Sequence, residues 1–251
     1  MSQIPKEQRL KRNVILINGH SKSESEKKSD NDLIHYYSNY FKSIAGGVYE
    51  DYEIIRLIEP TIGELKVLIQ ERKPDFVIIV FIGHGATQNG KQLFLTKEDQ
   101  IIQAGQLVLE VDKQLIIFES CRSITNSLLT IDLSDKIPNY KKGGVFRIPL
   151  SKNKARNLYN QELQKCDKGV VICFACSVNE EAWNFYFSYS LIDISHKWHS
   201  DIRNWNQTLG IQDLMPAIIT VVSKTALEEE TQNQTPVVNG VVNFPFAICK
   251  F

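Results

Sequence analysis

Two stretches of the sequence decide the fold, FVIIVFIGHGA at residues 76–86 and LIIFESCRS at residues 115–123. Each begins with an apolar run rich in β-branched side chains, which is typical of a strand covered on both faces of a parallel sheet. Each run ends at a chemically reactive residue, His84 in the first stretch and Cys121 in the second. Because ligands bind beyond the carboxyl ends of parallel strands, we expect these two side chains at one edge of the sheet.

The rest of the chain alternates between strand and helix patterns. Further strands are predicted at residues 13–18, 51–57, 170–175 and within 236–249. Helices are predicted at residues 32–44, after the Thr61–Glu64 capping box, at 185–205 and at 212–224, with a polar loop at 21–30. This order predicts an α/β fold with a mostly parallel central sheet.

Composition excludes several classes of protein. The chain has 251 residues, with 29 Lys and Arg against 29 Asp and Glu, so it lacks the basic excess of a nucleic-acid-binding protein. Its apolar runs are far shorter than the ~20 residues of a membrane-spanning helix. The N-terminus carries no signal-peptide pattern and the five cysteines are an odd number. These features predict a cytoplasmic protein with free thiols.

A histidine between glycines at one strand end and a cysteine at another form a candidate base–nucleophile pair. The glycine after His84 allows close approach of a substrate, so the Gly85 N–H is a candidate oxyanion donor. Taken singly, each residue has a simpler interpretation. A His-Gly turn is ordinary, and a cysteine at a strand end is most often a small buried hydrophobe. The two motifs together favour catalysis.

These motifs resemble those of the caspase-like cysteine peptidases, the clan of caspases, metacaspases and legumains. Residues 115–123 are similar to the Q-A-C-R-G pattern of caspases and the D-S-C-x-S pattern of metacaspases, and 76–86 to the family's strand before His-Gly. Weaker similarity at residues 89–94, 169–183 and 234–236 extends the resemblance over nearly the whole chain. The motifs come nearest to metacaspase-like and bacterial single-domain caspase-like proteins.

The resemblance implies a three-layer α/β/α fold with a mostly parallel central sheet, in one peptidase domain over residues 1–251. Within it, residues 1–124 correspond to the large-subunit part that carries His84 and Cys121. Residues 125–168 correspond to a basic intersubunit loop, and residues 169–251 to the small-subunit part.

The resemblance also assigns catalytic roles. Cys121 is the nucleophile and His84 its acid–base partner, and the backbone N–H groups of Gly85 and Cys121 form the oxyanion hole. A backbone carbonyl orients the imidazole in this family, so no third catalytic carboxylate is needed. No cofactor is required and no metal ligand set is assembled, although calcium is a candidate activator by analogy with metacaspases.

Specificity is predicted from the residue two positions before the nucleophile, Glu119. A carboxylate in the pocket floor favours Arg or Lys in the substrate. Legumains also have Glu there and cleave after Asn, so Asn specificity stays open, and Asp specificity is the remaining alternative. Asn179 and Glu180 are expected in a second pocket wall, and His20 is expected to line the pocket. The competing interpretation of Glu119 is a structurally paired carboxylate.

Residues 141–156 contain six basic residues and no acidic one. An enzyme that cleaves after basic residues is expected to process itself there, and a merely solvated loop is the alternative. The candidate self-cleavage sites are Lys142, Arg147, Lys152, Lys154 and Arg156.

The leading hypothesis is a cysteine endopeptidase that acts on a protein or peptide substrate, with an activating partner protein as one candidate trigger. The family suggests a role in programmed cell death. A catalytically silent interaction module of the same fold is the second hypothesis. An unrelated flavodoxin-like binding protein is the third.

Overall fold

The computed structural model describes residues 10–98, 100–123 and 150–250. A six-stranded sheet in the order β10-β8-β7-β3-β1-β2 forms its centre. The strands are β1 (Arg12–Asn18), β2 (Ile54–Ile58), β3 (Phe76–Ile82), β7 (Lys113–Glu119), β8 (Gly169–Phe174) and β10 (Val237–Asn239). All neighbours pair in parallel except β10, which runs antiparallel to β8 at the edge. The predicted, mostly parallel sheet is confirmed.

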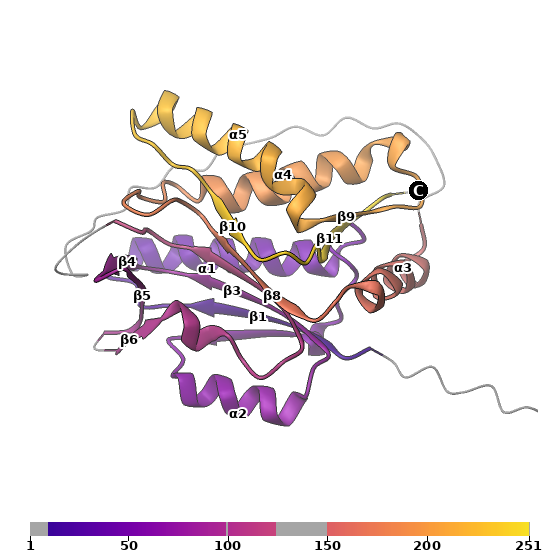
Figure 1. Cartoon of the computed structure of the whole chain (residues 1–251), viewed down its shortest axis with the longest axis horizontal. Helices are drawn as coiled ribbons and strands as arrows, with labels where there is room; N and C mark the ends of the chain where they lie inside the picture. Colours follow the sequence, from indigo (N-terminus) through magenta and orange to yellow (C-terminus); the bar gives the residue numbers. More distant parts are fainter. Residues whose placement is uncertain (1–9, 99, 124–149, 251) are drawn as a thin grey trace, which may run out of the picture.

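Helices cover both faces of this sheet. They are α1 (Glu24–Lys42), α2 (Ile62–Arg72), α3 (Lys152–Lys165), α4 (Tyr186–Ser200) and α5 (Ile211–Glu229). Helix α2 lies on one face, while α1, α4 and α5 lie on the other (Figure 1). Helix α3 packs into the same core as α1, α4 and α5. The arrangement is the expected three-layer α/β/α fold.

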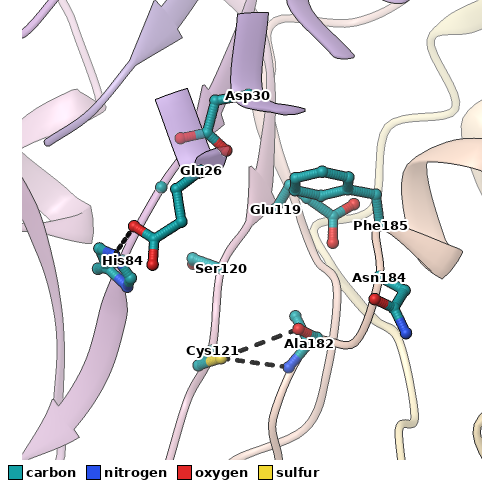
Figure 2. Close-up of a pocket in the computed structure, with 10 residues that line it drawn as sticks. Glu26, Asp30, His84, Glu119, Ser120, Cys121, Ala182, Asn184 and Phe185 are labelled. Atoms are coloured by element: carbon teal, nitrogen blue, oxygen red, sulfur yellow. Dashed lines mark hydrogen bonds and ion pairs between the residues drawn. The ribbon is translucent and has the colours of Figure 1, made fainter. Parts of the chain in front are cut away.

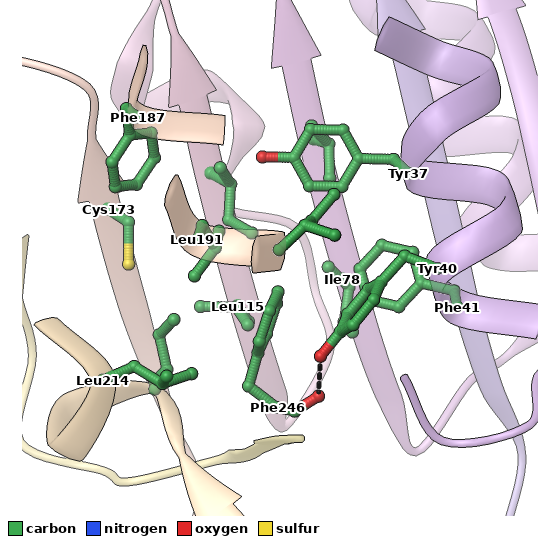
Figure 3. Packing of buried hydrophobic residues seen from close by; sticks show 14 of the residues in the cluster. Tyr37, Tyr40, Phe41, Ile78, Leu115, Cys173, Phe187, Leu191, Leu214 and Phe246 are labelled. Carbon is green, nitrogen blue, oxygen red and sulfur yellow. Dashed lines mark hydrogen bonds between the residues drawn. The ribbon is translucent and has the colours of Figure 1, made fainter. Parts of the chain in front are cut away.

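The middle residues of the central strands are apolar because both faces of the sheet are buried there, and β3 is apolar throughout. Along β3, Ile78 and Val80 pack toward α1 and α4, while Ile79 and Phe81 pack on the α2 side. All seven residues of β3 are fully buried. Figure 3 shows the larger core, where Tyr40 of α1 donates a hydrogen bond to the Phe246 carbonyl at 2.8 Å.

Two small sheets complete the fold. Strands β4 (Gly85–Gln88), β5 (Lys91–Lys97) and β6 (Gln100–Gln103) follow β3, and β9 (Thr208–Gly210) pairs with β11 (Pro245–Ile248). Short 3-10 helices occur at η1 (Asp51–Glu53), η2 (Ala104–Leu107) and η4 (Ile202–Asn204). Asn89 and Gly90 both have positive φ, 50° and 71°, which suits the tight turn between β4 and β5. Residues 89–94, one of the stretches that resemble the family, thus form the turn and part of the second strand of a β4–β5 hairpin.

Several boundaries differ from the sequence-based expectation. The strand predicted at residues 51–57 is the 3-10 helix η1 followed by β2, which begins at Ile54. Helix α1 begins at Glu24, inside the stretch predicted as a polar loop, because the Ser23 hydroxyl accepts the Glu26 N–H and caps it. Residues Lys152–Lys165 form α3, so the expected loop at 125–168 is not one continuous loop. The predicted tail strand is two strands, β10 and β11, in separate sheets. Among the described residues, no helix is long and apolar enough to span a membrane.

A buried ionic cluster joins β1, η1 and α3. Arg156 of α3 makes two hydrogen bonds to the Glu53 carboxylate, at 2.7 and 2.6 Å. The Arg12 guanidinium lies 3.7 Å from the same carboxylate and 4.1 Å from the centre of the Tyr49 ring. The exposed fractions of Arg12 and Glu53 are 1% and 3%. Two guanidinium groups thus share one buried carboxylate.

Removing that carboxylate leaves both cations uncompensated in the core. We expect Glu53→Ala to lower the free energy of unfolding by about 3–5 kcal/mol, measured by urea denaturation. Glu50→Ala is the matched control, because Glu50 lies 4.0 Å from Arg156 with 52% of its side chain exposed. Its cost is expected to stay below about 1 kcal/mol. Equal losses in the two variants would show that the cluster contributes no more than a surface ion pair.

Candidate active site

His84 and Cys121 lie at the carboxyl ends of two neighbouring strands. Strands β3 and β7 pair in parallel with Ile82 opposite Glu119, and His84 and Cys121 each lie two residues further along the chain. Both side chains line one pocket, shown in Figure 2. The expected juxtaposition at one sheet edge is therefore present.

Gly85 makes the close approach of the two strand ends possible. A Cβ at this position would lie 2.8 Å from the Cys121 carbonyl oxygen and 2.9 Å from Ser120 Oγ. Any side chain would force the residues after β3 away from those after β7. The glycine that follows His84 is thus a packing requirement of the site.

The imidazole of His84 is buried and bonded to a carboxylate. Its Nε2 lies 3.1 Å from Glu26 Oε2, and only 4% of the residue is exposed. Burial lowers the pKa of His84, and the Glu26 carboxylate opposes that shift. Sequence reasoning missed Glu26 because it expected no carboxylate partner. The available signal was the Ser23-x-x-Glu26 pattern of a helix start inside the predicted loop.

The thiol of Cys121 is also buried. The Ala182 N–H donates to its sulfur at 3.4 Å, and 4% of the residue is exposed. Burial raises the pKa of Cys121 to about 12, so the thiol is protonated at neutral pH. No hydrogen bond joins Cys121 to His84 in this structure, as Figure 2 shows. The nucleophile therefore needs a base before it can act.

Glu119 combines a structural contact with a position in the pocket. Its Oε2 accepts the backbone N–H of Ser188 at 2.9 Å, in the first turn of α4, and the Ser188 hydroxyl as well. Burial raises the pKa of Glu119 to about 7. Its second oxygen, Oε1, is buried and has no hydrogen-bond partner within the described part of the chain. Glu119 is therefore paired with Ser188 and also lines the pocket.

The pocket is acidic and nearly closed. Three carboxylates, from Glu26, Asp30 and Glu119, line it together with Asn184 and Phe185. Its cavity volume is about 30 Å³, which is enough for water but not for a long substrate side chain. Asn184 and Phe185 both have positive φ, 44° and 56°. Two adjacent residues with left-handed backbone conformations, which are strained for residues other than glycine, therefore form one wall of the pocket.

Gln234 holds that wall in place. Its side-chain oxygen accepts the Trp183 N–H at 3.0 Å, and its side-chain nitrogen donates to the Ala175 carbonyl at 3.1 Å. Gln234 is fully buried. The segment that contains Ala182, Asn184 and Phe185 is thus tied to the end of β8 by one glutamine.

Similarity to known proteins is found at the level of the fold alone. No protein-family model and no curated protein matches the sequence. Caspase-1 from Spodoptera frugiperda is 13% identical, with a TM-score of 0.52 over 92% of this chain and 86% of that chain. The chain has a caspase-like fold. The Drosophila initiator caspase Dronc also aligns, at 10% identity and a TM-score of 0.47, over 94% of this chain and 81% of that chain.

In this caspase-like fold, three residues expected in the pocket lie elsewhere. His20 Nδ1 is 2.8 Å from Glu59 Oε1. The Glu180 carboxylate accepts the Ser177 and Thr235 N–H groups, at 3.0 and 2.6 Å, and so braces a loop. The Asn179 N–H donates to the Arg122 carbonyl at 3.0 Å. The pocket wall is supplied instead by Ala182, Asn184 and Phe185, of which only Ala182 lies in the 169–183 stretch that resembles the family.

The candidate self-cleavage residues fall into two groups. Lys142 and Arg147 lie outside the described residues. Lys152, Lys154 and Arg156 belong to helix α3, and Arg156 is buried against Glu53. A helical, buried segment cannot enter a protease in extended form, so this placement disfavours cleavage after Arg156. Among the described residues, no group of His, Cys, Asp and Glu side chains could hold a metal ion.

The raised pKa of Glu119 makes stability depend on pH. Because its folded-state pKa is about 7 against an ordinary 4.5, the folded protein binds this proton more tightly than the unfolded chain. Stability is therefore lost as the pH rises through this interval. Glu119→Gln removes the ionisation. We expect its free energy of unfolding, relative to the wild type, to rise by up to about 3 kcal/mol between about pH 4.5 and 8.

Urea denaturation at several pH values measures this difference. Glu71→Gln is the control, because Glu71 lies exposed on α2 and its substitution should give no such trend. A Glu119→Gln difference that stays constant with pH would mean that Glu119 ionises equally in the folded and unfolded states.

Proposed function

We propose that the chain is a cysteine endopeptidase that cleaves protein or peptide substrates after Arg or Lys. One observation carries the proposal: a single pocket combines a thiol, an imidazole and three carboxylates at one sheet edge. The thiol and imidazole supply a nucleophile and a base. The carboxylates supply the negative charge that a basic substrate side chain requires.

Unsatisfied acceptors support basic specificity. Within the described part of the chain, Glu119 Oε1 and Asn184 Oδ1 are buried without a hydrogen-bond partner, and both residues line the pocket. Buried acceptors without partners are costly, so a side chain rich in N–H donors gains energy by entering. The planar guanidinium of Arg offers five such donors. An acidic side chain would meet repulsion from the carboxylates of Glu26 and Asp30, and from Glu119 above its pKa of about 7.

The reaction proceeds in two stages. His84 takes the proton from the Cys121 thiol, and the thiolate attacks the carbonyl carbon of the scissile bond. The N–H groups of Gly85 and Cys121 stabilise the oxyanion, and loss of one such donor typically costs ~10²–10³ in rate. The protonated imidazole gives its proton to the leaving amine. Water, activated by His84, then hydrolyses the thioester.

The closed pocket implies an activation step. A cavity of about 30 Å³ must widen before an Arg side chain can enter, and the thiol with a pKa of about 12 must gain contact with its base. The widening would have to displace part of the lining, such as the wall formed by Asn184 and Phe185. A partner protein, calcium and cleavage within residues 125–149 are the candidate triggers.

The same observations favour a second candidate function. A buried thiol and a closed pocket are also expected of a caspase-like interaction module without catalysis. Such a protein would keep Cys121 as a packed core residue. The two candidates differ in whether Cys121 supports turnover.

Hydrolysis of fluorogenic peptides tests the proposal directly. Peptides ending in Arg, Lys, Asn or Asp are offered to the wild type and to Cys121→Ala, with and without calcium. We expect kcat/KM for Arg or Lys to exceed that for Asp by at least about a hundredfold, because the pocket is acidic. Cys121→Ala is expected to show no turnover. Equal turnover by both proteins, or none by either under all conditions, would favour the interaction module.

The pocket assignment has its own paired variants. Measured at about pH 8, where Glu119 with its pKa of about 7 is ionised, Glu119→Gln is expected to lower the preference for Arg over Asn at least about tenfold, because it removes a buried charge. Glu180→Gln is the matched control, since this carboxylate lies near the site but braces Ser177 and Thr235. Its preference ratio is expected to stay unchanged. Hydrolysis after Asn alone would retain the nucleophile and discard the basic pocket.

Self-cleavage is predicted to occur after Lys142 or Arg147 and not after Arg156. The reason is that Arg156 is held by Glu53 within α3, where the backbone cannot extend into a protease cleft. Mass spectrometry of the incubated protein identifies the new termini, with Cys121→Ala as the uncleaved control. A fragment that begins at residue 157 would contradict this prediction.

A further inference from the structure

The Glu26 carboxylate contacts the His84 imidazole although the two residues are far apart in the sequence. The two residues are 58 positions apart, Glu26 in the first turn of α1 and His84 after β3. Their side chains are 11% and 4% exposed. A contact at 3.1 Å between two such buried groups is a defined feature of the site. The peptidase mechanism above makes no use of it.

Local structure fixes the position of this carboxylate. The Glu26 N–H donates to the Ser23 hydroxyl at 3.2 Å, which starts α1. The Lys22 N–H donates to Glu26 Oε2 at 2.7 Å, the same oxygen that lies against His84. The N-terminal end of a helix also favours negative charge. Glu26 is thereby held in one orientation, with the oxygen that faces His84 already anchored.

The contact determines which imidazole nitrogen carries the proton. A carboxylate only accepts hydrogen bonds, so the bond at Nε2 requires a proton on that nitrogen. In the neutral ring, the lone pair then lies on Nδ1. A histidine whose one nitrogen is bonded to a carboxylate has its tautomer and its ring orientation fixed.

We propose that Glu26 is a positioning residue that holds His84 as the Nε2–H tautomer, so that Nδ1 takes the proton from the Cys121 thiol. The inference rests on the proposed peptidase function. In this step the Sγ–H bond breaks, a bond from Nδ1 to the proton forms, and the electron pair stays on sulfur as the attacking thiolate. The imidazolium that results lies directly against the Glu26 carboxylate.

Charge makes Glu26 a stronger partner than a backbone carbonyl. Burial disfavours the imidazolium, as do the neighbouring charges of Lys22 and of His20 when it is protonated, whereas Glu26 stabilises it. A hydrogen bond to an ionised acceptor is about twice as strong as one between neutral groups. A buried thiol is a weak acid, so its base needs this support.

Glu26→Gln tests the proposal, with Glu24→Gln as the matched control. Glu24 lies in the same helical turn, but its side chain is 93% exposed and is paired with Lys27. The first measurement is ¹⁵N NMR of His84 as a function of pH, in a Cys121→Ala background. We expect the Nε2–H tautomer in the parent protein, and a His84 pKa that is lower by roughly one pH unit in Glu26→Gln.

The second measurement is the pH profile of peptide hydrolysis. Glu26→Gln is expected to lower kcat by at least about a hundredfold, because a lost carboxylate partner leaves the wrong tautomer. The acidic limb of kcat/KM is expected to move to lower pH. Glu24→Gln should match the wild type in both measurements.

The outcomes separate this inference from the peptidase proposal. An unchanged tautomer and pKa of His84 in Glu26→Gln would overturn the positioning role, whatever the activity. A rise in kcat would also overturn it, because Glu26 would then hold His84 away from Cys121. If the wild type hydrolyses no peptide, the peptidase proposal fails, and the NMR titration still decides whether Glu26 sets the tautomer.

Discussion

The parallel pairing of β3 with β7 is the constraint on which the candidate site depends. With Ile82 opposite Glu119, both strands end at the same level, and the two residues beyond each end face one another. The next strand, β8, continues this edge, since the Ala175 N–H donates to the Phe118 carbonyl at 2.9 Å. The segment after β8 then folds over the edge as a pocket wall. A shift of one residue in the register would turn every side chain to the other face.

The sequence alone predicts the buried central strands and the residues that directly follow them. The apolar runs of β3 and β7 identified both strands, and the residues directly after them identified His84 and Cys121. Helix α2 followed from the Thr61–Glu64 capping box, which the structure contains. These features depend on residues near one another in the chain, so local patterns carry them.

The parts that sequence could not supply depend on distant contacts. Glu26 belongs to a charged stretch whose pattern resembles a loop, and its partner lies 58 residues away. Glu180 was predicted to lie in the pocket because it follows β8, but its carboxylate accepts hydrogen bonds from Ser177 and Thr235. The position of a charged residue in the sequence does not identify a binding site, because its side chain can bond to a nearby backbone N–H as readily as to a substrate. Only the three-dimensional structure shows which acceptors keep a free oxygen.

The interleaving of strands has a consequence for any molecule cut between β7 and α3. Strand β7 comes from before such a cut and β8 and β10 from after it, yet they are neighbours in one sheet. The Arg12–Glu53–Arg156 cluster also draws on both pieces. The larger hydrophobic core draws buried side chains from both pieces, so separating the pieces would expose it to water. The two pieces of a cleaved molecule therefore stay together on dilution until the molecule unfolds. The lifetime of the cleaved protein is then set by its unfolding rate constant, which is kinetic rather than equilibrium stability.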